Sequence, residues 1–439
     1  MASSSTAPAP AKADSAAAPL SSSSSSSQSV LPFMTSSTTT SPVIAGHRGF
    51  KSQYTENTLL GFGKCFESGA TVIETDLWLS SDNVIVISHD ISTKRVFVDQ
   101  DGNETDYKIT KTPFDPILKN LKTKEGGYPL LSFVDVLQWF KKYVDATGSN
   151  EHKLQLDIKK FNPAKITKYL INDLLKVHND ISWWYHRIQF GLWDLSFLKF
   201  LNQNESFQDK FGIVNEFGCS QFDIFHISVN WRDSINYINY NYYLDETTPQ
   251  DRIKIKLTGV SLLYIATWST EFLTKFVPLL QIQNLKLYSW TINNKFQFEY
   301  LVKVGRLAKL VEYGVISDHP DVMVKYKKHE DSDSDTDVEV VNSNEAETKQ
   351  QQQQKPLVTY ESKNFYYNED GELNIGLTWN QKLLSWGFEK LMSLNGSQRK
   401  ITSNAQRFGA QIDENHVDEV KPNGIIVYIF QKCQKYGIF

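Results

Sequence analysis

Short apolar runs alternate with longer segments of helical periodicity across most of the chain. Most of the runs are brief and fit strands buried on both faces. The predicted strands cover residues 43–46, 71–77, 84–88, 154–158, 187–191, 223–229, 255–261, 286–290 and 314–317. Apolar residues recur at helical spacing in residues 58–68, 132–143, 163–177, 270–281 and 296–304, which we predict to be helices.

Strand and helix alternate over about 280 residues, which indicates either a closed (β/α)8 barrel or an open doubly wound sheet. No Gly-rich dinucleotide fingerprint follows the first predicted strand, and its absence favours the barrel. We therefore predict an α/β fold with a TIM-type (β/α)8 barrel over residues 43–326. Residues 92–128 are long for a strand-to-helix connection, which predicts an insertion or a lid over the site.

Two segments outside the barrel have too few apolar residues to build a core. Residues 1–42 are dominated by Ser, Ala, Thr and Pro, so we predict a disordered tail. A mitochondrial presequence is the alternative, although the segment contains no Arg. Residues 327–360 carry acidic and Gln runs and are predicted to be a disordered linker.

Residues 361–439 form a small C-terminal segment with one helical pattern, at residues 377–394. The apolar residues of one face are Leu377, Leu384, Phe388 and Leu391, with Trp379 and Trp386 nearby. This pattern predicts a helix that either packs on the barrel or docks at a membrane interface. The apolar run at 425–430 is far short of the ~20 residues that span a bilayer, so we predict no transmembrane helix.

Composition and charge argue against several classes of function. The formal net charge of the 439 residues is −4 and no basic run stands out, which argues against a nucleic-acid partner. The three cysteines are far apart, which fits a reducing compartment better than a disulfide framework. Zinc is unsupported because no Cys or His pair has ligand spacing. We also find no secretory signal.

Candidate chemistry begins directly after the first predicted strand, at His47 and Arg48. A histidine at the carboxyl end of a strand can act as a general acid or base, and an arginine offers permanently charged donors to a phosphate. When nothing else supports a site, a lone histidine after a strand is more often structural.

Support comes from Glu74 and Asp76, which alternate with Thr75 in an otherwise apolar strand. The two-residue period of a strand places both carboxylates on one face. Buried carboxylates side by side need a cation, and a hard oxygen-binding ion such as Mg²⁺ or Ca²⁺ is suitable. A salt bridge to Lys or Arg is the alternative.

Two further strand ends complete the set of candidates. His89 follows one predicted strand, while Asp157 and Lys159 share a face in another. Three carboxylates for a divalent cation, two histidines for proton transfer, and Arg48 with Lys159 for phosphate oxygens together predict a phosphoryl-transfer site.

At this point the sequence resembles the glycerophosphodiester phosphodiesterase family over residues 43–320. The motifs that carry the resemblance are Gly46-His47-Arg48-Gly49, Glu56-Asn57-Thr58, Glu74-Thr75-Asp76, His89-Asp90, Trp290-Thr291-Ile292-Asn293 and Ser317-Asp318-His319-Pro320. Their order and spacing match the family pattern.

The resemblance implies a role for each matching residue. His47 and His89 would be the catalytic pair, with the metal on Glu74, Asp76 and Asp157, phosphate on Arg48 and Lys159, and Trp290 lining the substrate pocket. The third metal ligand is commonly Glu in the family, whereas this chain has Asp157. For Trp290 the alternative is core packing. We expect a supporting role for Glu56 near the site and a structural role for Asn57, with Asn57 or Thr58 capping the helix.

Within the family, three further motifs are similar to fungal phosphatidylglycerol-specific phospholipase C: residues 156–159, 191–193 and 268–272. This similarity implies cleavage of phosphatidylglycerol to diacylglycerol and glycerol phosphate in phospholipid catabolism. It also implies an intracellular protein, peripheral on an internal membrane such as that of the mitochondrion, endoplasmic reticulum or lipid droplet. Two alternatives stay open: a soluble phosphodiesterase that releases glycerol 3-phosphate and an alcohol, and an inactive barrel that binds lipid.

Overall fold

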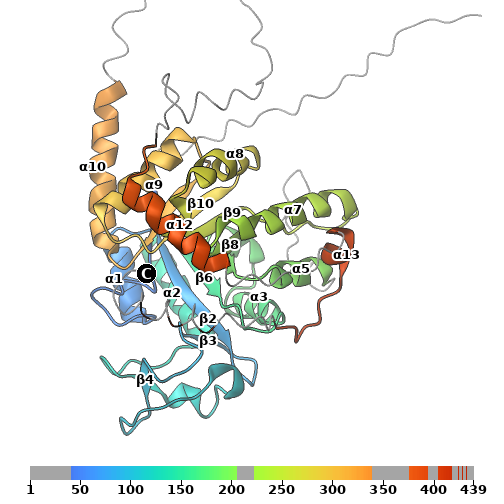
Figure 1. Ribbon diagram of the computed structural model, residues 1–439. Helices are drawn as coiled ribbons and strands as arrows, with labels where there is room; N and C mark the ends of the chain where they lie inside the picture. The colour runs from blue at the N-terminus through green and yellow to red at the C-terminus, as the bar shows by residue number, and fades with distance from the viewer. Residues whose placement is uncertain are drawn as a thin grey trace, which may run out of the picture. The chain divides into compact units, whose positions relative to one another are not determined.

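The computed structural model of the protein describes residues 41–204, 222–338, 375–393 and 404–417, and also residues 424, 428 and 432 (Figure 1). The predicted N-terminal tail up to residue 40 and residues 339–360 of the predicted linker lie outside the described residues.

A closed parallel barrel is the centre of the fold (Figure 1). Its strands pair in the order β1-β11-β10-β9-β8-β7-β6-β2, and β1 closes the ring by pairing with β2. The strands are β1 (Val43–Gly46), β2 (Val72–Leu79), β6 (Lys153–Ile158), β7 (Ile188–Leu192), β8 (Asp223–Ser228), β9 (Gly259–Leu263), β10 (Lys286–Trp290) and β11 (Tyr313–Ser317). The eight parallel strands confirm the predicted TIM-type barrel.

Helices connect successive strands of the barrel, and one more helix follows the last strand. The connecting helices are α1 (Leu59–Glu67), α2 (Phe133–Thr147), α3 (Ile166–Val177), α4 (Ile181–Tyr185), α5 (Leu195–Gln203), α7 (Trp231–Thr247), α8 (Val277–Ile282) and α9 (Lys295–Leu307), and α10 (Pro320–Val338) follows β11. Thr58 caps α1, because its hydroxyl accepts a hydrogen bond from the Gly61 N–H at 3.1 Å. The sequence pattern did not predict α4, α5 or α7.

The predicted strand at residues 84–88 is not part of the barrel ring. The residues form β3 (Ile85–Ile87), which pairs antiparallel with the end of β2, Leu77 opposite Ile87. Periodicity alone does not reveal the direction of pairing. Because β3 runs back along β2, the chain after it returns to the carboxyl end of the barrel, where the Ser88 N–H donates to the Asp76 carbonyl at 3.1 Å.

The predicted insertion is an ordered module that packs on the β2–β3 hairpin. It contains β4 (Phe97–Val98), β5 (Lys122–Thr123), and the 3₁₀ turns η1 (Ile109–Lys111) and η2 (Leu118–Asn120). Its apolar side chains form a separate cluster with residues of the hairpin: Trp78, Val86, Phe97, Ile109, Leu118, Leu121 and Leu130. This cluster fixes the module against the barrel.

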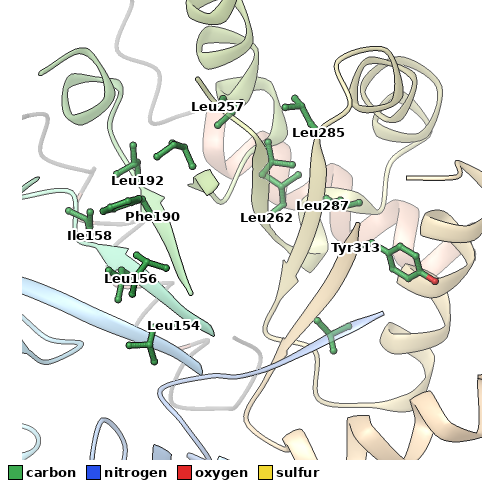
Figure 2. Packing of buried hydrophobic residues seen from close by; sticks show 14 of the residues in the cluster. Leu154, Leu156, Ile158, Phe190, Leu192, Leu257, Leu262, Leu285, Leu287 and Tyr313 are labelled. Carbon is green, nitrogen blue, oxygen red and sulfur yellow. The ribbon is translucent and has the colours of Figure 1, made fainter. Parts of the chain in front are cut away.

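Side chains alternate along each strand: one set packs in an apolar layer between the strands and the helices, and the other set faces the barrel interior. On β6, Leu154, Leu156 and Ile158 belong to the large core between strands and helices, as Figure 2 shows with Phe190 and Leu192 of β7. The intervening residues of β6 face the interior, where a smaller cluster consists of Ala45, Val72, Phe225, Tyr288 and Ile316. Burial of one large apolar side chain contributes about 1.5–3 kcal/mol.

The helix after β11 extends beyond the predicted end of the barrel at residue 326, since α10 continues to Val338. An ion pair anchors the acidic part of this helix, because Arg306 of α9 lies 2.7 Å from Glu330. The predicted linker therefore begins with helix rather than with irregular chain.

The C-terminal segment contributes α12 (Trp379–Ser393) and α13 (Asn404–Gly409). α12 packs against η3 (Tyr264–Thr267), the turn that directly follows β9. Beyond α13, the Ala164 and Lys165 N–H groups donate to the carbonyls of His416 and Glu414 at 3.0 and 2.8 Å. Among the described residues, no helix combines the length and apolarity needed to cross a membrane.

Candidate active site

Three carboxylates meet at the carboxyl end of the barrel, on two neighbouring strands. Glu74 and Asp76 share the inward face of β2, and the parallel register places Asp157 of β6 directly beside Asp76. Each residue offers a carboxylate oxygen within 4.8 Å of the others. All three side chains are buried, so the residues that the sequence separates by more than eighty positions form one acidic cluster.

Two side chains hold Asp157 in place. The Lys159 ammonium lies 2.6 Å from Asp157 Oδ2 and 2.5 Å from Asp76 Oδ1, so the lysine bridges both strands. The Trp193 indole N–H donates to the other oxygen of Asp157 at 2.7 Å. Burial lowers the pKa of Lys159, but the neighbouring carboxylates Asp157 and Asp76 outweigh burial and raise it above its usual value.

Glu74 lacks such a counter-charge. Its carboxylate accepts a hydrogen bond from the Arg48 backbone N–H at 2.9 Å, and within the described residues no Lys or Arg side chain forms an ion pair with it. Burial raises the pKa of Glu74 well above its usual value, and the charges of Asp76 and Asp157 raise it further. For Asp76 burial acts in the same direction, yet Lys159, His89 and Arg48 hold its pKa well below the usual value.

This donor set fits a hard divalent cation. Carboxylate oxygens are the ligands that Mg²⁺ and Ca²⁺ prefer, and the raised pKa of Glu74 marks a buried anion without enough positive charge around it. Glu74, Asp76 and Asp157 would hold the ion. The salt bridges expected as the alternative are present at Asp76 and Asp157 but leave Glu74 uncompensated.

His47 follows β1, and its ring is held by a carboxylate at the end of the neighbouring strand β11. Its Nδ1 lies 2.7 Å from Oδ1 of Asp318, the residue after β11. Asp318 also accepts hydrogen bonds from Lys51 at 3.2 Å and from the Asn293 amide at 3.1 Å. Burial and the neighbouring Arg48 charge lower the pKa of His47, whereas Asp318 opposes them. With Nδ1 engaged, Nε2 is the nitrogen available for proton transfer.

His89, which follows β3, has the same arrangement. Its Nδ1 lies 2.7 Å from Asp90 Oδ1. Burial, followed by the positive charges of Arg48 and Lys159, lowers the pKa of His89 to about 4. The antiparallel return of β3 explains how this histidine reaches Asp76.

Arg48 and Glu56 belong to a series of ion pairs that extends outward from the acidic cluster. Arg48 adopts a positive φ of 53°, its Nε lies 3.6 Å from Asp76 Oδ2, and its Nη1 lies 3.3 Å from Glu56. Glu56 in turn accepts from Arg95 of the insertion at 2.6 Å, and Arg95 also donates to Asp90 at 2.6 Å. Burial would raise the pKa of Glu56, but Arg48 and Arg95 lower it to about 2. Glu56 thus lies between Arg48 and Arg95, and its supporting role stays a prediction.

Trp290 lies at the carboxyl end of β10 and is half-buried. Its indole N–H donates to the Ser261 carbonyl at 3.1 Å, and its ring meets that of Trp193 edge-on at a centroid distance of 5.9 Å. Through Trp193 it adjoins Asp157. Contact between Trp290 and a substrate stays a prediction.

Sequence reasoning missed five residues that contact the predicted site residues: Asn57, Asp90, Arg95, Trp193 and Asp318. Asp90, Trp193 and Asp318 belong to motifs already noted, so their positions after strands were the available signal. Asn57, expected to be structural, donates to Asp76 Oδ2 at 2.9 Å from a backbone with φ 57°. Arg95 lies in the insertion, where no pattern pointed to it.

Comparison with known proteins agrees with this geometry. Residues 47–322 match the model of the Glycerophosphoryl diester phosphodiesterase family. The uncharacterized protein YqiK of Bacillus subtilis (strain 168) is 36% identical over 104 residues, which are 23% of this chain and 40% of that protein. A glycerophosphodiester phosphodiesterase of Bacillus altitudinis is 42% identical over 52 residues, 12% of this chain and 21% of that protein. The chain thus spans well under half the length of these curated relatives.

Solved structures share little sequence with this chain. The match to a glycerophosphoryl diester phosphodiesterase structure from Silicibacter pomeroyi DSS-3 covers 66% of this chain and 94% of the chain in that structure. The identity is 15% and the TM-score is 0.47. A phosphodiesterase of Oleispira antarctica in complex with the product sn-glycerol-3-phosphate covers 66% and 97%, with 17% identity and a TM-score of 0.46. The match of the family model extends from the histidine after β1 into α10, and the chain belongs to the Glycerophosphoryl diester phosphodiesterase family.

Proposed function

We propose that this protein is a metal-dependent phosphodiesterase that hydrolyses the diester of a glycerol-headgroup phospholipid. The observation that carries the proposal is the buried trio Glu74, Asp76 and Asp157 together with two histidines that follow β1 and β3, each with a carboxylate on its Nδ1. Family membership supports a glycerol phosphodiester as the substrate class.

In the proposed mechanism, Arg48 and Lys159 bind phosphoryl oxygens at the carboxyl end of the barrel. Arg48 Nε is buried and has no hydrogen-bond partner within the described residues, so it is a donor available to an anionic ligand. A bound divalent cation would polarise the phosphoryl group and offset the charge that develops in the transition state.

The two histidines divide the proton transfers. One Nε2 withdraws a proton from the nucleophile, and the other protonates the leaving oxygen. Asp318 and Asp90 fix the rings by their bonds to Nδ1. The nucleophile is either water or the free 2-hydroxyl of the headgroup glycerol, which would first give a cyclic phosphate; detection of that cyclic product in a single turnover distinguishes the two.

Phosphatidylglycerol is our preferred substrate, with diacylglycerol and glycerol phosphate as products at an internal membrane. The bond between Trp193 and Asp157 supports this choice, because it links two motifs that resemble the phosphatidylglycerol-specific enzymes and accounts for the shorter acid at this position. A soluble phosphodiesterase acting on deacylated lipid is the second candidate, and the family match lies closer to it, although the match is compatible with both substrates.

The test compares the two substrates with the purified full chain. Phosphatidylglycerol vesicles and soluble glycerophosphoglycerol are offered with and without EDTA, and diacylglycerol and free glycerol phosphate are measured. We expect diacylglycerol only when Mg²⁺ or Ca²⁺ is present. Turnover of the soluble diester alone would establish the second candidate, and no turnover of either would refute the proposed activity and leave the lipid-binding barrel.

A further inference from the structure

Helix α12 presents two opposite faces, and the more apolar one points outward. The buried residues of the helix are Gln381, Ser385 and Phe388, of which two are polar, and the half-buried Met392 also packs against the core. On the other side, Trp379 is 73% exposed, Leu383 46% and Trp386 59%. These three are spaced four and three residues apart, so they form one stripe along the helix. A surface helix usually buries its apolar stripe, and the reversed pattern indicates a second apolar contact.

The charges on this outward face have one sign. Lys382 and Lys390 lie within the stripe, and both are exposed. The single carboxylate of α12, Glu389, points to the barrel instead, where it pairs with Arg232 at 2.8 Å. An exposed face of tryptophan, leucine and lysine without an acid matches the interface of an anionic phospholipid membrane.

The position of α12 connects this face to the candidate active site. The helix packs on η3, directly after β9, and so lies at the carboxyl end of the barrel. A cavity of about 790 Å³ extends beneath it, and its lining includes Trp386, Phe388 and Trp193. Trp193 is bonded to the proposed metal ligand Asp157. One wall residue, Trp386, therefore belongs both to the outward stripe and to the cavity beside the acidic cluster.

We propose that the outward face of α12, defined by Trp379, Lys382, Leu383, Trp386 and Lys390, docks on an anionic phospholipid bilayer. The docked helix turns the carboxyl end of the barrel toward the lipid headgroups. This inference rests on the proposed function in that the membrane carries the substrate, but binding is measured without turnover.

The first test is flotation of the full chain with vesicles in EDTA, comparing phosphatidylglycerol-rich vesicles with pure phosphatidylcholine. We expect the double variant Trp379→Ser/Leu383→Ser to bind the anionic vesicles at least about tenfold more weakly, because the variant no longer buries two apolar side chains in the bilayer. Its turnover of soluble glycerophosphoglycerol should equal that of the wild type. The matched control is Ile282→Ser, which removes an equally exposed apolar residue at the end of α8, where the chain enters the amino end of β10.

A second variant tests the charge. Lys382→Gln/Lys390→Gln should weaken binding to anionic vesicles by about fivefold for each lysine and leave the weak binding to phosphatidylcholine unchanged. The proposal is overturned if the wild type does not bind anionic vesicles, or if Trp379→Ser/Leu383→Ser binds them like the wild type. It is also overturned if light scattering shows a dimer that this variant dissociates, since a second copy would then cover the face. Absence of turnover with both substrates would refute the proposed function, while flotation would still report on α12.

Discussion

Both ends of the barrel hold charged clusters, but they differ in whether each carboxylate has a cation beside it. At the amino end, Lys286 lies 2.8 Å from Asp223 and 3.4 Å from Glu312, and the Tyr288 hydroxyl donates to Glu312 at 2.9 Å. At the carboxyl end, Glu74 accepts a backbone N–H but forms no ion pair within the described part of the chain, and its pKa is raised. A cluster satisfied by its own residues stabilises the barrel, whereas an incompletely compensated one is suited to binding a cation.

The largest expected effect is at the carboxyl end. His47→Ala and His89→Ala should each lower kcat by about 10²- to 10⁴-fold, because each removes one proton transfer. Steady-state turnover measures the effect, and thermal unfolding should show a folded protein in both cases.

His186→Ala is the matched control for the two histidine variants, since His186 is exposed and lies before β7 at the opposite end. Its kcat should not change. Near-normal turnover of both His47→Ala and His89→Ala would show that the site has been assigned to the wrong residues.

A substitution at the amino end of the barrel should lower stability and leave turnover nearly unchanged. Lys286→Met leaves the half-buried Asp223 and Glu312 without their shared cation, so the free energy of unfolding should fall by about 1–3 kcal/mol. Urea denaturation measures the loss. We expect kcat of the remaining folded protein to stay within about twofold of the wild type, as residues at this end of a barrel serve stability. A large loss of kcat without loss of stability would contradict the division between the two ends.

His226 tests whether a histidine outside the candidate site acts only on stability. Burial lowers its pKa to about 3, and its Nδ1 lies 2.8 Å from the Ser234 hydroxyl. Since the unfolded chain has a pKa near 6.5, the folded state binds fewer protons between these values. Stability is then complete above about pH 6.5 and falls by about 1.4 kcal/mol for each unit of acidification below it.

The comparison uses His226→Gln, which has no titrating ring. Unfolding free energies of both proteins are measured from pH 7 to pH 4, and their difference isolates the contribution of His226 from other titrating groups. An unchanged difference across this range would mean that His226 is not buried in its neutral form.

The strands of the barrel could be predicted because they are buried on both faces and read as apolar runs. The pairing direction of residues 84–88 could not, since an antiparallel hairpin and a parallel barrel strand have the same composition. Helix α7 was missed because its Tyr and Asn residues blur the apolar stripe. On α12 the sequence grouped Leu384 with Phe388, yet Leu384 is exposed and Gln381 buried, because spacing does not tell which of two stripes meets the barrel.

The sequence predicted those residues of the candidate site that lie at the ends of strands. Glu74, Asp76 and Asp157 could be grouped because charged residues in apolar strands are conspicuous and parallel strands end together. Arg95 could not be predicted, since its contacts with Glu56 and Asp90 depend on how the insertion packs on the β2–β3 hairpin. Tertiary contacts of this kind leave no local pattern.

The smallest expected effect concerns Trp193, which positions a proposed ligand without contacting the metal itself. Trp193→Phe keeps the aromatic volume against Trp290 but removes the N–H bonded to Asp157. We expect the apparent affinity for Mg²⁺ or Ca²⁺ to fall by about tenfold, because a group that orients a metal ligand typically contributes 10- to 100-fold. Turnover as a function of metal concentration should show recovery at high metal, which loss of a ligand by Asp157→Ala would not. If Trp193→Phe lowered kcat equally at every metal concentration, Trp193 would act on the substrate and not through Asp157.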